Sequence, residues 1–330
     1  MIALFRLLSL LPLWLLQALG AVVGGLVWLA SKRYRDNFNR HIVQAGLQSA
    51  RRRAIFETGK TIFELPKIWL RPNAEVVRRV AHVSGWELMD AGVAAGRGIV
   101  LLTPHLGCFE ITAQYCASHR PITVLYRRAK QRWLAPLVEA GRGANLKLAP
   151  ADLSGVRRLL KALKNGETIG LLPDQAPGTG EGIWVPFFGK SAYTMTLAAR
   201  LADTGATVLM IYAERLNWGR GYHVHVQALS APLQGDLATR TAQINGEIES
   251  LIRRCPGQYL WAYNRYKTPA GAEPPPDGVS SAPTDGVSPS ATARSASSAR
   301  PPCSAVVSDS AVVSSAPTDG VSPAPTDGST

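Results

Sequence analysis

The residue types best suited to acid–base chemistry are His105 and Glu110, which lie five positions apart. They follow an apolar run at 98–102 whose length and β-branched residues predict a buried strand. Gly107 permits a turn, and the segment 111–118 predicts a helix. On one continuous helix the two side chains would lie about 140° apart, but a loop histidine and a helix-start glutamate can converge.

This pair predicts a general base at the end of a strand. A carboxylate that accepts a hydrogen bond from one imidazole nitrogen fixes the tautomer, and the other nitrogen can then take a proton from a hydroxyl. Open α/β sheets hold their sites at the carboxyl ends of strands. A purely structural interpretation is also consistent with the spacing, because a glutamate in the first helical turn favours the helix dipole.

A second carboxylate follows another apolar run. Residues 168–172 predict a strand, and Asp174 and Gln175 come directly after it, before a glycine-containing loop. The sequence VPFFGK at 185–190 follows, and then a helix is expected over about 192–203. Taken alone, Asp174 also fits a turn or a helix cap.

Three arginines stand apart from the many basic residues of the chain, most of which we interpret as solvated helix faces. Arg127 and Arg128 end a predicted strand at 121–126, and Arg142 lies between two glycines. Glycine on both sides allows the backbone to approach a ligand closely. The guanidinium group matches the geometry of phosphate oxygens better than an ammonium group does.

Together these blocks resemble the lipid A biosynthesis lauroyl/myristoyl (Kdo2-lipid IVA) acyltransferases, a branch of the HX4D/E glycerolipid acyltransferase superfamily. The resemblance rests on the HX4E motif from His105 to Glu110, on Asp-Gln with VPFFGK, and on the closing block from Trp261 to Lys267. It covers roughly residues 1–267. Some members have a histidine where this chain has Tyr263, so a role for that histidine does not transfer.

The resemblance implies a fold, a reaction and a compartment. The fold would be α/β, with a mixed, mostly parallel sheet flanked by helices behind an N-terminal membrane helix. The reaction would move an acyl chain from acyl-acyl carrier protein to a hydroxyl of a Kdo-bearing lipid A precursor, without a cofactor or a metal. His105 would act as the general base, oriented by Glu110. The enzyme would lie at the inner membrane with its catalytic domain facing the cytoplasm.

The resemblance also implies roles for the other candidate residues. Arg142 would contribute to the site, and Asp174 and Gln175 would line the acceptor site. Arg127 and Arg128 would contact phosphate or the carrier. Phe187 and Phe188 would shape the acyl pocket or its loop.

Other functions remain open at this point. One alternative is a lysophospholipid or ornithine-lipid acyltransferase that uses the same pair of residues. Another is a membrane-anchored protein that binds anionic lipid without catalysis. Cys108 is a rival nucleophile beside His105, but its place on an apolar helix start predicts packing.

The N-terminus predicts a membrane anchor at 1–31. Between residues 2 and 30 only Arg6 is charged, and this length suffices to cross a hydrocarbon core of about 30 Å. Basic residues follow at once, which places the rest of the chain in the cytoplasm by the positive-inside rule. A cleaved signal peptide, or a helix broken near Pro12 and lying partly in the membrane, are the alternatives.

Charge and composition divide the rest of the chain. The net charge is +13, and because two arginines and six acidic residues follow Lys267, residues 1–267 carry +17. This charge predicts an anionic partner, and the apolar N-terminus favours a membrane over nucleic acid. We therefore predict an acyltransferase domain at 32–267. Residues 268–330 repeat APTDG motifs with few large apolar side chains, which predicts a disordered tail.

Two histidines raise the question of a metal. Residues 222–226 alternate like a strand, which would place His223 and His225 on one face. Two imidazoles at this spacing can bind a cation, but the sequence shows no clear third ligand. We therefore predict no metal site.

Overall fold

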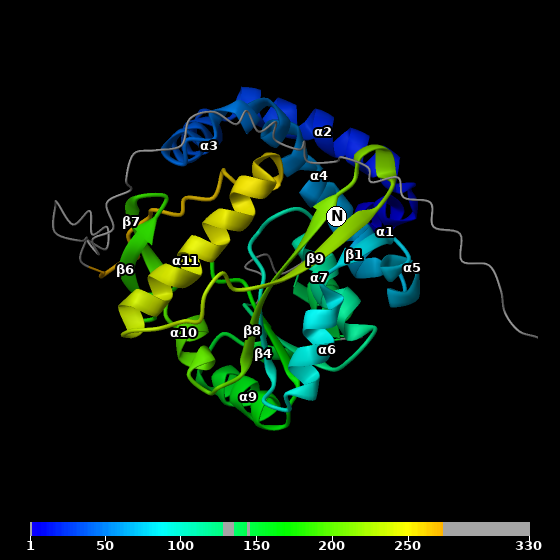
Figure 1. Ribbon diagram of the computed structural model, residues 1–330. Helices are drawn as coiled ribbons and strands as arrows, with labels where there is room; N and C mark the ends of the chain where they lie inside the picture. Colours follow the sequence, from blue (N-terminus) through cyan, green and yellow to red (C-terminus); the bar gives the residue numbers. More distant parts are fainter. Residues whose placement is uncertain (1, 128–134, 144–145, 273–330) are drawn as a thin grey trace, which may run out of the picture. The chain divides into compact units, whose positions relative to one another are not determined.

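The computed structural model describes residues 2–127, 135–143 and 146–272. A seven-stranded sheet forms its centre, with the strand order β1-β9-β8-β2-β5-β3-β4, and β6 and β7 form a separate hairpin (Figure 1). Neighbouring strands of the sheet are parallel except β8 and β9. The predicted mixed, mostly parallel sheet is confirmed. The strands are β1 (Val80–Ser84), β2 (Ile99–Leu102), β3 (Ile122–Tyr126), β4 (Lys147–Pro150), β5 (Thr168–Leu171), β6 (Gly182–Phe187), β7 (Lys190–Met195), β8 (Thr207–Arg215) and β9 (Tyr222–Ala228).

Helices flank this sheet and precede it in the chain. The helices are α1 (Ile2–Leu10), α2 (Leu13–Ala30), α3 (Lys32–Gln44), α4 (Arg51–Leu70), α5 (Asn73–Val77), α6 (Trp86–Ala94), α7 (Phe109–Ala117), α8 (Ala135–Gly143), α9 (Leu153–Lys164), α10 (Leu197–Ala202) and α11 (Leu237–Arg254), with short 3-10 turns η1 (Gln48–Ala50), η2 (Asn217–Gly219) and η3 (Pro256–Gln258). Asp236 begins α11 by accepting a hydrogen bond from the backbone N–H of Thr239 at 2.8 Å. Arg128 and the segment 273–330, for which predictions were made, lie outside the described residues.

The two central strands explain why the sheet was recognisable in the sequence. All residues of β2 and β5 are buried, and parallel strands covered on both faces are expected to be continuously apolar. The strands pair in parallel, with Leu102 beside Leu171. The loops that follow them therefore leave the sheet side by side at the same edge, which is where His105 and Asp174 lie.

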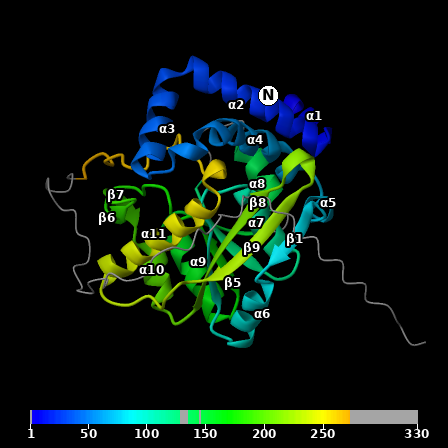
Figure 2. The ribbon, with the colours of Figure 1, turned by 45° about the horizontal axis from the view of Figure 1, so that its top comes forward.

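The predicted anchor folds as two helices. α1 ends at Leu10 and α2 begins at Leu13, and the break falls at Pro12, which has no backbone N–H to donate. Of the helices described, α2 alone has the length and composition that would allow it to cross a bilayer. Both helices lie alongside α4 in two views of the chain (Figures 1 and 2).

Small residues bring α2 against α4. Gly20 and Gly24 face Gly59, and a Cβ atom added to any of the three would overlap the backbone of the opposite helix. A polar contact fixes the register, because Gln17 donates a hydrogen bond to Glu64 at 2.8 Å. α2 is therefore packed along the charged helix α4 on one face and leaves its other face uncovered.

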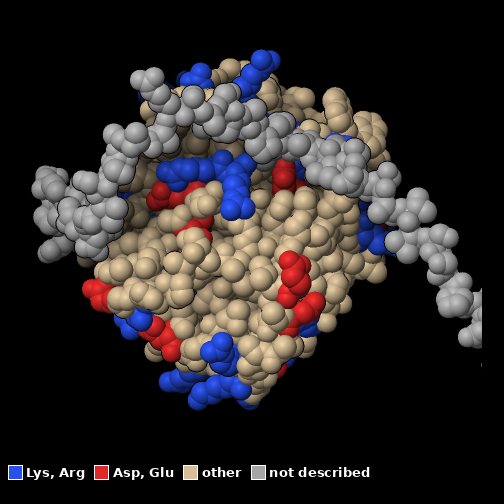
Figure 3. All heavy atoms as spheres, viewed as in Figure 1, with Lys and Arg blue, Asp and Glu red and all other residues tan. Residues whose placement is uncertain are grey.

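The charged side chains are unevenly spread on the face shown in Figure 3. One group of Lys and Arg lies within the upper part of this face beside acidic side chains, other groups lie along its edges, and the centre carries few charges. Among the described residues visible there, the basic side chains thus form several patches and not one continuous surface.

Candidate active site

Backbone hydrogen bonds hold the loop that carries His105. The Gly107 N–H donates to the carbonyl of Gln258 at 3.0 Å, and the Leu260 N–H donates to the carbonyl of His105 at 3.2 Å. Gly107 has φ +63°, and a Cβ at this position would collide with the carbonyl oxygen of Ala213. Only glycine fits both conditions. The loop is therefore clamped between β8 and the segment that follows η3.

Asp174 is the carboxylate that binds His105. Its Oδ1 lies 2.7 Å from the ring Nδ1, and its Oδ2 accepts the His105 backbone N–H at 2.9 Å. The Asp174 residue is 1% exposed, so water does not compete for it. A carboxylate in this position fixes the proton on Nδ1 and leaves the lone pair on Nε2.

Gln175 contacts the other ring nitrogen. Its amide Nε2 lies 3.0 Å from His105 Nε2. Because an amide nitrogen only donates, this contact fits the tautomer in which His105 Nε2 accepts. A substrate hydroxyl that transfers its proton to Nε2 must therefore take the place of this amide.

Glu110 lies in a different hydrogen-bond arrangement from the one predicted. Arg142 donates to both of its carboxylate oxygens, with Nε 2.9 Å from Oε2, and the Trp69 indole N–H donates to Oε2 at 3.0 Å. The prediction that Glu110 orients the His105 ring directly is thus corrected, since Asp174 holds that position.

The geometry of the turn explains this difference. Glu110 lies in the first turn of α7, after Gly107 has redirected the chain, and its side chain points toward Trp69 of α4 and Arg142 of α8. Asp174 approaches from the neighbouring strand β5 and meets His105 where the two strands end. The sequence shows both strand ends but not that β2 and β5 are neighbours.

Both buried carboxylates stay ionised because hydrogen bonds and nearby positive charge offset their burial. Burial alone would raise the pKa of Asp174, but the charge of His105, its two hydrogen bonds and the charge of Arg265 lower that pKa below its ordinary value. Burial likewise opposes ionisation of Glu110, and the charge and hydrogen bonds of Arg142 lower its pKa overall.

A cavity of about 50 Å³ lies beside the Glu110–Arg142 pair. It is mainly lined by apolar side chains from β2, α7, β3 and β5, among them Leu101, Phe109 and Val124. The Phe109 ring is also 4.7 Å from the His105 ring, measured between centroids. Phe109 is therefore shared by the cavity wall and the surroundings of His105, although His105 is not itself a lining residue.

Three other predicted residues lie apart from this group. Arg127 is an exposed side chain that pairs with Glu181 at 3.4 Å. Phe187 and Phe188 are buried at the end of the β6–β7 hairpin, where their rings contact Arg265 and Arg253 respectively. Neither phenylalanine lines the cavity beside Glu110, as far as the described residues define it.

Cys108 has the surroundings of a packing residue. It is 2% exposed and belongs to the buried apolar cluster beneath β8 and β9. Burial raises the pKa of its thiol far above the ordinary value. Because a thiol nucleophile needs an accessible thiolate, this environment agrees with the predicted structural role.

Several residues of the site were not singled out in the sequence. Trp69 contacts Glu110, and the Tyr263 hydroxyl accepts the backbone N–H of Ala176 at 3.0 Å, beside Gln175. The closing block gave a signal for Tyr263, because it was recognised as a unit. Nothing in the spacing of Trp69 connects it to residue 110.

A buried ionic network connects the His105 loop to α4. Arg215, at the end of β8, donates to Glu57 and Glu64 of α4 at 2.8 Å and contacts the Gly107 carbonyl at 3.4 Å. Glu64 also accepts from Gln17 of α2. Helices α2 and α4 and the site loop therefore share one set of polar contacts.

A histidine held by a buried carboxylate at the carboxyl edge of a mostly parallel sheet defines an α/β enzyme site suited to general-base catalysis. Residues 1–268 match the model of the bacterial lipid A biosynthesis acyltransferases. The chain belongs to this family, and it is an acyltransferase.

The relatives that this chain matches include enzymes named for lipid A and one named for another lipid. The lipid A biosynthesis lauroyltransferase of Escherichia coli K12 is 28% identical over 268 residues, covering 78% of this chain and 87% of the relative. The palmitoleoyltransferase of the same strain is 26% identical, covering 64% and 69%. A phosphatidylinositol mannoside acyltransferase of Mycobacterium tuberculosis H37Rv is 28% identical, covering 61% and 64%.

Proposed function

We propose that this enzyme transfers a fatty acyl chain from acyl-acyl carrier protein to a hydroxyl of a lipid A precursor, with His105 as the general base. The observation that carries this proposal is the pairing of His105 Nδ1 with the buried Asp174 carboxylate, which leaves Nε2 as the proton acceptor. Family membership supports a lipid A precursor as the acceptor.

The proposed reaction is a direct acyl transfer. The acceptor hydroxyl displaces the Gln175 amide from His105 Nε2 and gives its proton to that nitrogen as its oxygen attacks the thioester carbonyl. The carbon–sulfur bond then breaks, and the thiolate takes the proton from the imidazolium. Asp174 stabilises the imidazolium in the interval, because its negative charge lies 2.7 Å from Nδ1.

Glu110 acts through Arg142 in this proposal. The ion pair forms part of the wall of a mainly apolar cavity, and Phe109 of the same wall contacts the His105 ring. The apolar wall suits the start of the acyl chain, and a guanidinium fixed in it suits the oxyanion of the transition state or an acceptor phosphate. Glu110 would thus position Arg142. The two residues of the HX4E motif would then act with different partners, His105 with Asp174 and Glu110 with Arg142.

The charge of the first 267 residues supports the choice of donor. An acyl carrier protein is acidic, and opposite charges speed the encounter of two proteins. The exposed Arg127 remains a candidate contact for the carrier or for phosphate, because it lies at the end of β3, the second strand from β2 in the sheet.

We also propose that α1 and α2 attach the enzyme to the inner membrane, with the catalytic domain in the cytoplasm. Their uncovered face carries large apolar side chains, including Leu7, Trp14, Val22 and Leu26. Trp218 of η2, which is 90% exposed, is on the turn that packs against α2. Aromatic and apolar side chains on one surface suit the interface of a bilayer.

The packing of α2 supports an orientation parallel to the membrane. Charged residues of α4 lie along the other side of these helices, where Glu64 accepts a hydrogen bond from Gln17 of α2 and Lys67 donates to the Ser9 carbonyl of α1. A spanning α2 would carry these charges into hydrocarbon, which is costly. Protease digestion of N-terminal and C-terminal tags in sealed vesicles of known orientation tests this. Tags cut from the same side support the parallel orientation, whereas tags cut from opposite sides would establish a spanning helix.

A transfer assay tests the reaction. Membranes holding the protein receive labelled acyl-acyl carrier protein with a Kdo-lipid A precursor or, in parallel, a lysophospholipid. We expect label in the precursor, loss of transfer in His105→Ala, and full activity in His119→Ala, whose histidine is exposed in the turn after α7. Transfer to the lysophospholipid alone would overturn the acceptor but keep the base. No transfer to either acceptor would favour a lipid-binding role.

The relatives also favour one alternative acceptor. Because a phosphatidylinositol mannoside acyltransferase covers 61% of this chain at 28% identity, related chemistry on another lipid acceptor is the second candidate. The lysophospholipid and ornithine-lipid acceptors predicted as alternatives from the sequence belong to this second candidate. Including a phosphatidylinositol mannoside in the same assay separates these cases.

A further inference from the structure

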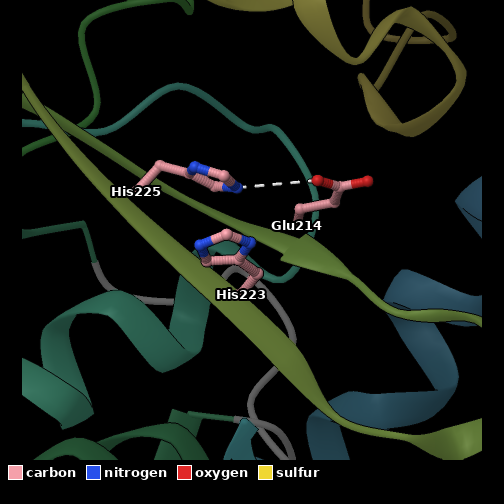
Figure 4. A group of neighbouring side chains, drawn as sticks. All are labelled: Glu214, His223 and His225. Atoms are coloured by element: carbon pink, nitrogen blue, oxygen red, sulfur yellow. Dashed lines mark ion pairs between the residues drawn. The ribbon is translucent and has the colours of Figure 1, made fainter. Parts of the chain in front are cut away.

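Two histidines and a glutamate gather on the β8–β9 pair, away from the residues assigned above. His223 and His225 lie on the same face of β9, and Glu214 is the partner of His223 on the antiparallel strand β8. Figure 4 shows the two rings and the carboxylate turned toward one another. One ligand atom from each lies within 4.8 Å of the others, and no other group of this kind was found in the described part of the chain. The antiparallel pairing supplies the third ligand that the sequence did not show.

The spacing is close to that of a metal site. His225 Nε2 and Glu214 Oε2 are 3.5 Å apart. Two atoms that bind one tetrahedral zinc ion at about 2.1 Å lie about 3.4 Å from each other. This pair therefore needs almost no movement to share an ion, and His223 needs a small rotation of its side chain.

His225 lacks a hydrogen bond that would explain its position. Its Nε2 is buried and makes no hydrogen bond within the described residues, since the 3.5 Å contact with Glu214 is an ion-pair distance only. The ring stacks on Tyr212 with centroids 4.6 Å apart. Stacking fixes the ring plane, and the unused nitrogen is directed toward Glu214.

The neighbouring strand β1 supports His223. The Ser84 hydroxyl lies 2.7 Å from His223 Nε2, which leaves Nδ1 for an ion. A hydrogen bond to the second ring nitrogen is the usual support of a histidine ligand. His82 is paired with His223 in the sheet, and their ring centroids are 5.5 Å apart, so His82 is within reach as a fourth ligand.

The group holds one carboxylate. Glu214 is 8% exposed and supplies a negative charge beside the two imidazoles. An imidazole binds a metal through the lone pair of its neutral form.

We propose that Glu214, His223 and His225 form a binding site for a divalent transition-metal cation, with Zn²⁺ as the best match and His82 as a further ligand. Two imidazoles and one carboxylate suit zinc in preference to Mg²⁺ or Ca²⁺, which prefer oxygen ligands. The ligands come from strands β8, β9 and β1, so the ion would fix this edge of the sheet. The site is structural and takes no part in the acyl transfer.

Metal binding to the full-length protein tests this directly. The protein is treated with EDTA, dialysed and titrated with ZnCl2 by calorimetry, and its unfolding temperature is recorded with and without zinc. We expect one Zn²⁺ per chain and a rise in the unfolding temperature. The double variant His223→Ala/His225→Ala should lose at least tenfold in affinity, whereas the control His119→Ala should bind as the wild type does.

Two further measurements address a double variant that fails to fold and zinc binding by cysteine. Glu214→Gln keeps the size of the side chain and should weaken binding even if the double variant fails to fold. Co²⁺ should give a spectrum of nitrogen and oxygen ligands without thiolate bands, which separates this site from binding by cysteine. Absence of zinc binding by the wild type, unchanged binding in Glu214→Gln, or thiolate bands with Co²⁺ would each overturn the proposal.

Discussion

Replacing Asp174 by asparagine separates the roles of the two carboxylates near His105. Asp174 accepts two N–H groups of His105, one from the backbone and one from the ring. Asparagine has one acceptor oxygen and one donor nitrogen. Because the backbone N–H cannot change, the asparagine oxygen should turn toward it and present its amide to the ring.

This rotation would reverse the tautomer of His105. The ring can accept from the amide only by moving its proton from Nδ1 to Nε2, and Nε2 then has no lone pair for the acceptor hydroxyl. The loss of a charge-assisted hydrogen bond costs about 1.5–3 kcal/mol, or roughly 10- to 150-fold in rate. The wrong tautomer adds to this, and a comparable change in serine proteases lowers kcat about 10⁴-fold. We expect kcat to fall on the order of 10³- to 10⁴-fold in Asp174→Asn.

The assay is acyl transfer at saturating acceptor, with Glu110→Gln measured in parallel. Circular dichroism and urea unfolding check that both variants fold. Glu110→Gln should keep the His105 tautomer, because Asp174 is intact, and should lose activity through a misplaced Arg142. Activity of Asp174→Asn within tenfold of the wild type would refute this reasoning and return the orienting role to Glu110.

Three further predictions follow from the same contacts. Arg142→Lys keeps the charge but not the two-point contact with Glu110, so activity should fall at least tenfold and urea unfolding should show a loss of about 1–2 kcal/mol. Gly107→Ala should cost more than about 3 kcal/mol in the same measurement because a carbonyl of β8 blocks its Cβ, whereas Gly96→Ala, at a similar positive φ in open space, should cost about 1–2 kcal/mol. Folding lowers the pKa of Asp174, so the unfolded chain binds a proton at this carboxylate more readily than the folded chain does. The wild type should therefore lose stability as the pH falls below about 4, and more steeply than Asp174→Asn does.

The sequence predicted the central strands of the sheet well, because buried parallel strands are apolar throughout. The helix expected over about 192–203 is wrong at its start, where β7 (Lys190–Met195) pairs with β6, and α10 begins only at Leu197. The runs at 98–102 and 168–172 correspond to β2 and β5. Asp174 and Gln175 were singled out because their block was recognised, and both contact the His105 ring. Pro12 was noted as a possible break, and the helix is interrupted there.

The order of the strands in the sheet and the directions of the side chains could not be predicted from the sequence. Nothing in the spacing of His105 and Asp174 shows that β2 and β5 pair, and this pairing decides which carboxylate meets the histidine. Glu110 was assigned to His105 because both lie in one motif, yet its partners come from α4 and α8. The third member of the histidine group, Glu214, likewise depends on the antiparallel pairing of β8 and β9.

The hydrogen-bond network around Arg215 joins the N-terminal helix α2 to the loop that carries His105. Gln17 of α2 and Arg215 of β8 bind the same side chain, Glu64, and Arg215 also reaches the carbonyl of Gly107 in the histidine loop. Any effect of a ligand at α2 on the affinity for substrate at His105 must be reciprocal, because linkage acts equally in both directions. If a lipid surface that binds α2 changed the affinity for substrate, bound substrate would change the affinity for lipid by the same factor. The proposed membrane surface and the histidine loop are joined through the single side chain of Glu64, so Glu64→Gln is the variant that would alter both.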